Sequence, residues 1–468
     1  MRVFNSLTRR IEEFEPIDPP HVGMYSCGPT VYWNQHIGHM YAYVQWDCLV
    51  RFLRYTGNKV TWVMNMTDVG HLTSDEDEGE DKMEKGAKRE GLSVWEIADK
   101  YIRQFLESMD LLNITRPDVL CRATDHIAEQ IDLIKEIEAN GFTYRTSTGL
   151  VFDTSKFPDY AKFAKLDLKA QEAGKRVDVD KEKRQPWDFL LWITNQPGHI
   201  MKWDSPWGVG FPGWHIECTA MSTKYLGKKF DIHTGGIEHI PVHHTNEIAQ
   251  AFGAFGERTA NYWLHNSWLL VDGEKMSKSI GNNILTTDLA AKGFDPLALR
   301  YLILNSTYHQ GLNFTWEAMQ NAQNSLVKLK AKIGALRQGL QGPALQRAVG
   351  CAGYEQEFLG KINADLNMPE ALAVVWKMID DATLPPSARL VSLFRFDQVL
   401  GLGLDRVEGE GRELVDWERD EKLRGLVEER ERLRKEKEFA EADEVREKIA
   451  QMGYTVEDTP DGVKVKRA

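Results

Sequence analysis

Two histidines lie three residues apart, in the run His36-Ile37-Gly38-His39, where a strand is expected to give way to a helix. The N-terminus of a helix offers free N–H groups and a favourable dipole to an anion. Gly38 lets the backbone approach closely, and the imidazoles add further donors. This arrangement suits a polyphosphate. Four residues alone fit two ordinary loop histidines equally well.

A second group is the cationic run Lys275-Met276-Ser277-Lys278-Ser279, which Ile280-Gly281-Asn282 follows. Two lysines among small hydroxylated residues predict a mobile loop that closes on a pyrophosphate while charge develops on it. Taken alone, the pentapeptide also fits an exposed basic turn.

Thiol, imidazole and carboxylate side chains are scattered along the chain in a set that could hold a metal ion. His243 and Glu247 are four residues apart, which places both on one face of a helix. Cys27 and Cys218 could converge on them from other elements. The spacing is not that of a zinc finger, and buried structural cysteines are the simpler interpretation on spacing alone.

The elements that position these residues follow a strand, loop and helix order. Val22–Ser26 and Lys59–Met66 are predicted buried strands, and a helix begins near Gly38 between them. A further strand over Phe230–His233 precedes a helix that begins near His243. The sequence therefore predicts an α/β fold with a doubly wound, Rossmann-like parallel sheet, whose ligands lie beyond the ends of its strands.

Composition restricts the class of protein. The chain has 468 residues and a formal net charge of −12, and about 150 residues per domain predicts about three domains. The acidic total argues against a general nucleic-acid coat, and no apolar run approaches the roughly 18–20 residues of a membrane span. An odd, dispersed set of cysteines argues against a disulfide framework and favours a cytoplasmic enzyme. These cysteines are Cys27, Cys48, Cys121, Cys218 and Cys351.

The two histidines and the lysine pair together form the HIGH and KMSKS signature of class I aminoacyl-tRNA synthetases. Longer runs make the chain closely resemble the cysteinyl-tRNA synthetase family almost from end to end. They are Met24–Tyr32, Asn65–Asp68, Phe211–Cys218, Asp365–Leu372, Ala440–Arg446 and Glu457–Gly462.

The resemblance implies a role for each site residue. Cys27, Cys218, His243 and Glu247 fall on the positions that bind one Zn²⁺ per chain in this family. ATP, with Mg²⁺, is expected to meet His36, Gly38, His39 and Lys278, and His36, His39, Lys275 and Lys278 are the expected catalytic residues. Thr67, Trp214 and Glu238 are expected to contact cysteine.

The resemblance also implies a domain order: catalytic halves around an insertion, then a tRNA-binding helical bundle and a small α+β anticodon module. The expected boundaries are 1–114, 115–200, 201–295, 296–405 and 406–468. Cations of the last module, Arg430 among them, are expected to face RNA.

Several residues depart from the family pattern. Trp33 replaces a usual Asp, Val69-Gly70-His71 replaces Ile-Asp-Asp, Thr245 replaces an acid, and Glu238 stands where Asp is usual. Contacts just beyond Asp68 are therefore in question. The charge run Ser74–Glu90 is interpreted as a solvated loop and helix start rather than a site.

The expected function is ATP-dependent cysteine activation and transfer to tRNA(Cys), by a cytoplasmic monomer with no membrane segment. Two alternatives stay open. One is a cysteine ligase that uses an amino-sugar acceptor, which the bundle and tail argue against. The other is a non-catalytic paralogue that only binds tRNA or nucleotide, which the intact motifs argue against.

Overall fold

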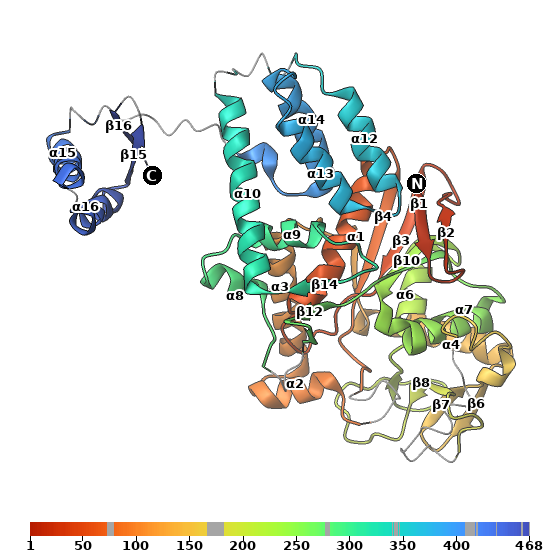
Figure 1. Cartoon of the computed structure of the whole chain (residues 1–468). Coiled ribbons are helices and arrows are strands. Elements are labelled where there is room, and N and C mark those ends of the chain that lie inside the picture. The colour runs from red at the N-terminus through yellow and green to blue at the C-terminus, as the bar shows by residue number, and fades with distance from the viewer. Residues whose placement is uncertain are drawn as a thin grey trace.

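The computed structural model describes residues 1–72, 79–165, 182–276, 281–338, 347–407, 420–436, 438–459 and 462–467, together with residues 340, 345 and 417. A five-stranded parallel sheet in the order β11-β10-β3-β4-β5 forms its centre, with helices on both faces (Figure 1). The predicted doubly wound α/β fold is confirmed. The strands are β3 (His21–Ser26), β4 (Lys59–Met66), β5 (Val119–Arg122), β10 (Phe230–Gly236) and β11 (Ala260–Asn266).

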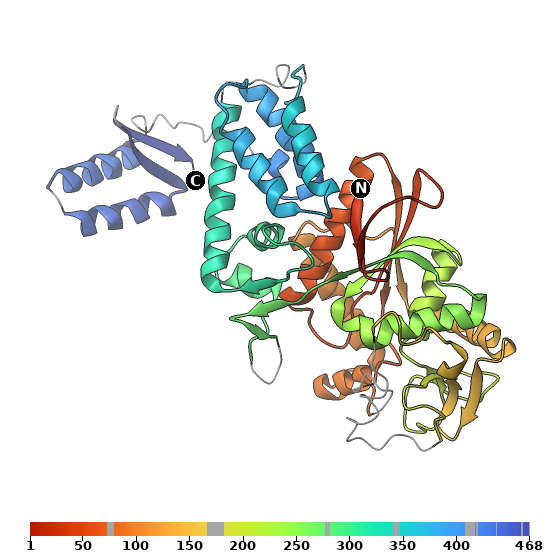
Figure 2. The same ribbon diagram turned by 45° about the vertical axis from the view of Figure 1, so that its right-hand side comes forward.

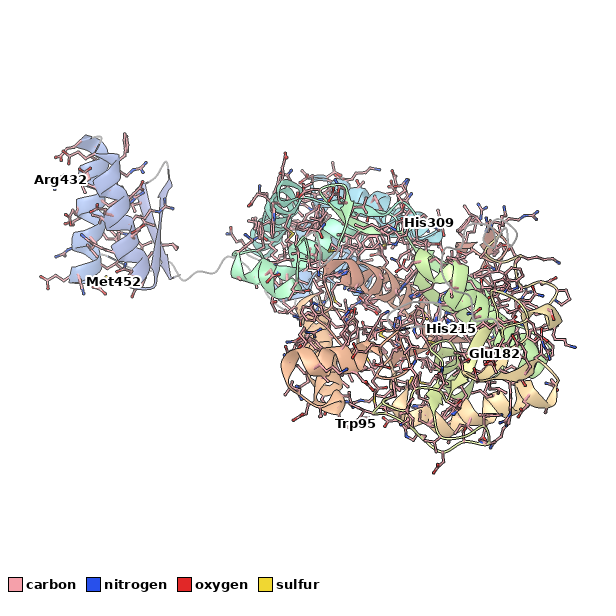
Figure 3. The ribbon with its side chains drawn as sticks, turned by 90° about the horizontal axis from the view of Figure 1, so that it is seen from below. Trp95, Glu182, His215, His309, Arg432 and Met452 are labelled. Carbon is pink, nitrogen blue, oxygen red and sulfur yellow. The ribbon has the colours of Figure 1, made fainter. Side chains whose placement is uncertain are left out.

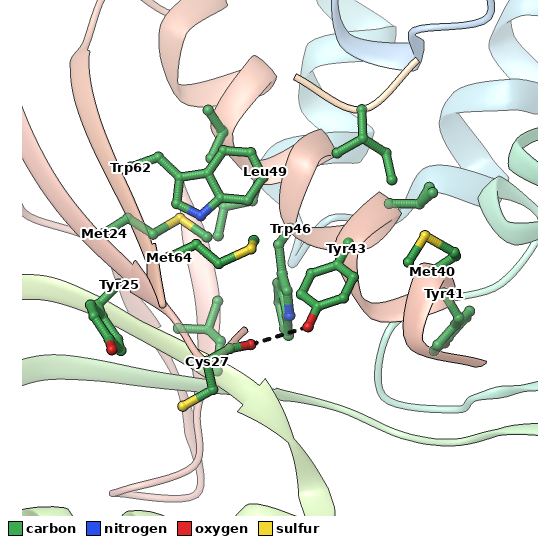
Figure 4. Close-up of a cluster of buried hydrophobic side chains, with 14 of the residues drawn as sticks. Met24, Tyr25, Cys27, Met40, Tyr41, Tyr43, Trp46, Leu49, Trp62 and Met64 are labelled. Atoms are coloured by element: carbon green, nitrogen blue, oxygen red, sulfur yellow. Dashed lines mark hydrogen bonds between the residues drawn. The ribbon is translucent and has the colours of Figure 1, made fainter. Parts of the chain in front are cut away.

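The centre of this sheet is buried on both sides. β4 is almost continuously apolar from Val60 onward, as a parallel strand covered on both faces must be. Helix α1 (Ile37–Tyr55) packs against β4, and a close-up shows Met40, Trp46 and Leu49 among the buried side chains that fill this region (Figure 4). β3 and β10 are neighbours although α1 leads away from β3 to β4, so the sheet opens a crevice beyond the carboxyl ends of β3 and β10.

The sequence predicted that residues 115–200 form one insertion, but in the structure they do not. β5 pairs with β4 from Val63↔Val119 to Met66↔Arg122, and it is therefore an edge strand of the central sheet. Helix α4 (Ile127–Ala139) packs against α6 (Ile216–Leu226) and α7 (Thr245–Phe255) of the second half. The separate sheet of the insertion runs past residue 200. Its strands are β6 (Thr143–Thr146), β7 (Gly149–Phe152), β8 (Phe189–Ile193) and β9 (Phe211–Pro212).

A short sheet and a helical bundle follow the central sheet. Strand β12 lies between β13 and β14 beside α1, and the bundle packs against α1 through α9 and α14. The predicted helical periodicity after residue 295 is thus observed. The elements are β12 (Leu269–Val271), β13 (Glu274–Lys275), α8 (Thr286–Ala291), α9 (Pro296–Leu304), β14 (Leu312–Phe314), α10 (Trp316–Arg337), α12 (Ala352–Asn363), α13 (Met368–Ile379) and α14 (Pro386–Leu400).

A buried arginine ties the bundle to the central domain. Arg300 of α9 donates from Nη2 to Asp47 Oδ2 of α1 at 2.6 Å and from Nε to the Leu400 carbonyl at 2.6 Å. Its Nη1 donates to the carbonyl of Leu112, just after α3 (Val94–Leu111), at 3.0 Å. Both charged side chains are fully buried. One guanidinium therefore joins four segments.

The N-terminal hairpin of β1 (Arg2–Asn5) and β2 (Arg10–Glu13) completes its contacts with residues far along the chain. The Phe4 N–H donates to Asp365 Oδ1 at 2.8 Å, and the Asp365 N–H donates to the Arg2 carbonyl at 3.1 Å. Tyr308 also donates to Asp365 Oδ1, at 2.8 Å. The first strand is thus held by the loop between α12 and α13.

The last part of the chain has a hydrophobic core of its own, which includes Leu423, Val427 and Ile449. Figure 2 shows its two helices lying beside a hairpin, and Figure 3 labels Arg432 and Met452 on them. The predicted hairpin is confirmed, but Arg430 is 2% exposed and donates to Glu431, so it does not face RNA as expected. The elements are α15 (Glu421–Glu436), α16 (Phe439–Gln451), β15 (Tyr454–Thr459) and β16 (Gly462–Arg467). Among the described residues, no helix is both long and apolar enough to cross a membrane.

Candidate active site and metal centre

A cavity of about 1040 Å³ lies at the carboxyl ends of β3, β4 and β10. It is lined by the residues after β3, by the start of α1, by the end of β10 and by β12 and β13. All the described residues that the sequence predicted to bind ATP or cysteine line it: His36, Gly38, His39, Thr67, Trp214, Glu238 and Lys275. Lys278 lies outside the described residues.

The two signature histidines form the N-terminal cap of α1. His36 Nδ1 accepts a hydrogen bond from the Gly38 N–H at 3.1 Å, and His39 Nδ1 accepts from the His36 N–H at 3.2 Å. Removal from water lowers the pKa of His39 well below its ordinary value, and His36 lowers it further. With Nδ1 occupied as an acceptor, Nε2 is the ring nitrogen of each histidine that can carry a proton. The two rings are thereby fixed as hydrogen-bond donors at the cavity.

The start of the KMSKS segment, Lys275-Met276, packs directly on this cap. The Ile37 N–H donates to the Ile284 carbonyl at 2.9 Å, which joins the segment after the loop to α1. A Cβ at Gly38 would lie 2.4 Å from Met276 Cε, so only glycine leaves room for this side chain without a shift. Lys275 Nζ lies 3.3 Å from the centre of the Trp268 ring. The HIGH cap and the start of the KMSKS segment, far apart in sequence, therefore meet at one wall of the cavity.

Four potential metal ligands converge at the floor of the cavity. Cys27 follows β3, Cys218 lies in α6, His243 lies in a π-helical turn (Ile240–His244) and Glu247 lies in α7. All four are buried, and one ligand atom from each lies within 4.8 Å of the others. His243 Nε2 and Glu247 Oε1 are 3.0 Å apart.

The chemistry of these four donors fits zinc. A tetrahedral site with bonds of roughly 2.0–2.3 Å places its ligand atoms roughly 3.3–3.8 Å apart, and thiolate, imidazole and carboxylate are the usual ligands. Burial raises the pKa of the Cys27 thiol, but the hydrogen bond with Cys218 and the charge of His244 outweigh it, and the pKa falls well below its ordinary value. Burial likewise raises the pKa of Glu247, but His233 and His243 hold it at about 2. Two anionic ligands are therefore available.

Further buried imidazoles surround this floor. His233 Nε2 lies 2.8 Å from Glu247 Oε2, and His244 Nε2 lies 3.3 Å from Cys27 Sγ, so Cys27, His233, His244 and Glu247 form a second set within 4.8 Å. His215, labelled in Figure 3, lies 2.9 Å from His243 through their Nδ1 atoms. The two sets share Cys27 and Glu247. A single ion at this floor would therefore be bound by one set or by the other.

The three residues expected to contact cysteine differ in their surroundings. Thr67 is buried, donates to Glu217 and accepts from Asn65 Nδ2 at 3.0 Å. Trp214 is stacked against the ring of His243, with centroids 4.4 Å apart. Glu238 is exposed and accepts from Trp268 Nε1 at 3.0 Å. Thr67 and Trp214 thus form fixed walls, whereas Glu238 lies at the rim.

The segment beyond Asp68 turns toward the cavity in this chain. Gly70 has a φ of +74°, and its N–H donates to the buried Asp81 carboxylate at 2.9 Å. This turn brings His71 against Trp214. Asp68 itself accepts from the Thr124 N–H at 3.0 Å and does not line the cavity.

The charge run before residue 90 is only partly solvated, contrary to its interpretation from sequence. Helix α2 (Lys82–Glu90) begins inside it, and three cations of this helix line the cavity: Lys82, Lys85 and Arg89. Their spacing of three and four residues after the helix cap Asp81 was the signal available in the sequence, because it places them on one helix face. Residues 73–78 of the run lie outside the described residues.

Comparisons with known proteins identify the family of the chain. The family model described as tRNA synthetases class I (C) catalytic domain matches residues 13–324, and the model described as cysteinyl-tRNA ligase anticodon binding domain matches residues 420–465. Cysteine–tRNA ligase 1 of Burkholderia lata is 46% identical over 99% of this chain and 96% of its own length. Cysteine–tRNA ligase of Treponema denticola is 42% identical over 98% of each chain.

Solved structures support the fold. Mycobacterium tuberculosis methionyl-tRNA synthetase in complex with methionyl-adenylate aligns with a TM-score of 0.55 and 16% identity, over 84% of this chain and 92% of that chain. A catalytic-domain match over more than half of the chain, together with full-length relatives above 40% identity, establishes the family. The chain belongs to the cysteinyl-tRNA ligases, a family of the class I aminoacyl-tRNA synthetases.

Proposed function

We propose that this protein is a cysteine–tRNA ligase, which activates cysteine with ATP to cysteinyl-adenylate and transfers it to the 3′-terminal adenosine of tRNA(Cys). One observation carries the proposal. Four buried metal-ligand side chains converge at the floor of the same cavity whose wall holds the HIGH cap and the start of the KMSKS segment. A thiol-selective floor and a polyphosphate-binding wall are what cysteine activation requires.

In this proposal Cys27, Cys218, His243 and Glu247 hold one Zn²⁺. A zinc ion there would supply a soft Lewis acid, which prefers the thiolate of cysteine to the hydroxyl of serine. Thr67 and Trp214 bound the space beside it, and Glu238 lies at its entrance. The fixed walls then position the amino acid so that its carboxylate faces the wall of the cap.

ATP, with Mg²⁺, lies along the wall that joins the two signature segments. His36 and His39 donate from Nε2 to phosphate oxygens, and Gly38 lets the helix N-terminus approach them. The amino-acid carboxylate attacks the α-phosphorus, the bond from the α-phosphorus to the bridging oxygen breaks, and pyrophosphate leaves. Lys275 and Lys278 stabilise the charge on the leaving group. No nucleophile from the protein is needed.

The rest of the chain serves tRNA in this proposal. The helical bundle, 296–405, meets the body of the tRNA, and the C-terminal module, 406–468, meets the anticodon; the match of residues 420–465 to an anticodon-binding family supports the second assignment. The proposal includes a cytoplasmic location, where aminoacylation supplies the ribosome, and a monomer. Sedimentation of the purified chain tests the monomer.

The decisive experiment is cysteine-dependent ATP–pyrophosphate exchange, followed by transfer of labelled cysteine to a purified tRNA(Cys) transcript. Exchange with cysteine and transfer to the transcript are expected, and serine is expected to give neither. Absence of exchange refutes the proposal that the protein activates cysteine with ATP. Exchange with transfer only to an amino sugar, such as glucosaminyl-inositol, refutes the tRNA assignment.

A further inference from the structure

Helix α2 presents a cationic face at the rim of the cavity. Lys82, Lys85 and Arg89 follow one another at intervals of three and four residues, and all three line the cavity. Lys88, on the same helix, does not line it and is paired with Glu80. The cations at the cavity are therefore one face of α2.

Two of these cations have unused donors. The side chain of Lys85 is exposed, and among the described residues its ammonium group has no hydrogen bond or ion pair. Arg89 Nη2 donates to the Tyr32 carbonyl at 2.9 Å and to Glu90 at 2.7 Å, whereas its Nε and Nη1 have no partner among the described residues. Lys82 differs because it is bonded to His71. Lys85 and Arg89 are thus the cations that can accept an anionic ligand.

A flat aromatic surface lies beside them. The Arg89 guanidinium lies 3.6 Å from the centre of the Trp33 ring, and Trp33 is stacked in turn on Tyr101 at 6.4 Å. Trp33 also lines the cavity. A guanidinium held flat on an indole offers its outer face to a nucleobase, in addition to donors for phosphate.

The helix is anchored, so this face is held in place at the cavity. Asp81 caps α2 through the Met83 N–H at 2.7 Å and accepts from the Gly70 N–H at 2.9 Å. The buried His199 lies 3.2 Å from the same carboxylate, which ties α2 to the segment before β9. Glu84, on the opposite side of the helix, accepts from the Ile200 N–H at 2.6 Å.

The position of this face indicates which of the three substrates, cysteine, ATP or tRNA, binds to it. The proposed zinc ligands at the floor are buried, whereas Lys85 and Arg89 are exposed at the rim. A ligand that reaches the floor and also extends out across the rim must be long. Of the substrates of a cysteine–tRNA ligase, only the tRNA extends from the cavity into solvent. Its single-stranded 3′ end carries both phosphates and unpaired bases, which suit lysine and a stacked guanidinium.

We propose that the α2 face formed by Lys85, Arg89 and Trp33 binds the single-stranded 3′ end of the tRNA: Lys85 contacts a phosphate, and one base stacks on the Arg89–Trp33 pair. This inference rests on the proposed function. It assigns the face to the transfer step, and cysteine activation does not use it.

The test separates the two half-reactions. Lys85→Ala, Arg89→Ala and the double variant are compared with Lys88→Ala, which removes a cation from the same helix away from the cavity. The double variant is expected to raise the KM for tRNA(Cys) in aminoacylation about tenfold. It should also reduce the salt dependence of tRNA binding by roughly 0.7 in log–log slope, since the phosphate contact of Lys85 is lost and each lost contact to a single strand removes roughly 0.7. Its cysteine-dependent ATP–pyrophosphate exchange changes less than twofold, and Lys88→Ala changes neither reaction.

Two outcomes overturn the inference: an unchanged KM for tRNA in the double variant, or a raised KM for ATP in exchange, which would assign these cations to the nucleotide. Trp33→Leu keeps the cations and is expected to raise the KM for tRNA several-fold without changing the salt slope. Lys85→Ala removes no contact within the described structure, so it tests the face even if Arg89→Ala disturbs the fold. Absence of exchange in the unaltered protein refutes the proposed function. That outcome differs from the two outcomes that overturn the inference about the α2 face.

Discussion

His71 and Trp214 lie face to face, with ring centroids 3.9 Å apart and planes inclined by 10°. A second imidazole stacked on the indole is that of His243, whose ring is 4.4 Å away. His71 is itself fixed, because its Nδ1 lies 2.6 Å from Thr30 Oγ1 and its Nε2 contacts Lys82. Trp214 is therefore held between two imidazoles as a preformed wall of the proposed cysteine pocket.

Replacing His71 is expected to loosen this wall. An aromatic pair contributes about 0.5–1.5 kcal/mol, so His71→Ala should raise the KM for cysteine in ATP–pyrophosphate exchange roughly 3- to 10-fold with a smaller change in kcat. His71→Phe keeps a flat ring and should recover most of the loss. His21→Ala, which alters an exposed histidine, is the control. An unaltered KM in His71→Ala would show that the stack does not shape the pocket.

The metal centre predicts the consequence of losing one thiolate. Cys218→Ser should remove about one zinc per chain, measured by elemental analysis of the purified protein, because serine is a poor ligand for a soft cation. Cys351→Ser alters a buried cysteine of the helical bundle and should keep the metal. Equal zinc contents in the two variants would refute the assignment of Cys218.

The contact between the two signature segments gives a prediction for Gly38. A methyl group at Gly38 would lie 2.4 Å from Met276 Cε and 3.0 Å from the His36 ring. Gly38→Ala should therefore lower kcat/KM for ATP in the exchange reaction at least tenfold, roughly the loss expected when reacting groups are misplaced. Adding Met276→Ala removes the nearest atom and should restore activity several-fold. Gly360→Ala, in α12 at a position where a Cβ would meet nothing within 4 Å, controls for the loss of a glycine.

The buried ion pair predicts a large effect on stability. Arg300→Met leaves Asp47 with Arg51 as its remaining guanidinium partner and removes the donors to the Leu400 and Leu112 carbonyls. Breaking a buried pair costs about 3–5 kcal/mol of the free energy of unfolding. Arg116→Ala breaks an exposed pair with Asp110 and should cost less than about 1 kcal/mol. Urea denaturation of both variants measures the difference, and similar midpoints would contradict it.

Asp68 predicts a dependence of stability on pH. Burial raises the pKa of Asp68 to about 6, against the hydrogen bonds from Thr124 that lower it. In the unfolded chain the carboxyl titrates near pH 3.9, roughly its ordinary value. Between about pH 4 and 6 the folded protein keeps this proton and the unfolded chain loses it, so this contribution to stability is full below pH 4 and is lost as the pH rises through 6.

Asp68→Asn should abolish the loss of stability that the Asp68 carboxyl causes as the pH rises. The free energy of unfolding of the variant relative to the unaltered protein should rise by up to about 3 kcal/mol between pH 4 and pH 7, because two pKa units correspond to about 2.7 kcal/mol. Urea denaturation at pH 4, 5, 6 and 7 measures it. Asp132→Asn, at an exposed position of α4, should show no such trend. A difference that is constant with pH would contradict the assignment.

The sequence was informative where local pattern decides structure. Lys59–Met66 was predicted as a strand with the bounds that the structure has, because a run of apolar and β-branched residues needs no further information. β5 was missed since it has only four residues, and its place in the sheet depends on pairing with β4. Arg430 was misjudged for a related reason: which side of an amphipathic helix is buried depends on its packing partner.

The candidate site also contains features that the local sequence predicts and features that depend on distant contacts. The helix start at His36 and His39 could be predicted from adjacent residues, because the cap that orients them is local, but their role could be predicted only together with the lysine run. The orientation of α2 could not, because it depends on the bond between Gly70 and Asp81 and on His199, more than a hundred residues away. The spacing within a charge run shows which of its members share a helix face, but it does not show whether that face turns toward a cavity.

The attachment of Phe4 to Asp365 has a consequence for synthesis of the protein. Strand β1 leaves the ribosome before the carboxylate that receives its N–H, which follows 361 positions later in the chain. At roughly 5–20 residues per second, that partner emerges about 20–70 s afterwards. During this interval the hairpin of β1 and β2 lacks its bundle contact, so a chaperone would have that time to bind it.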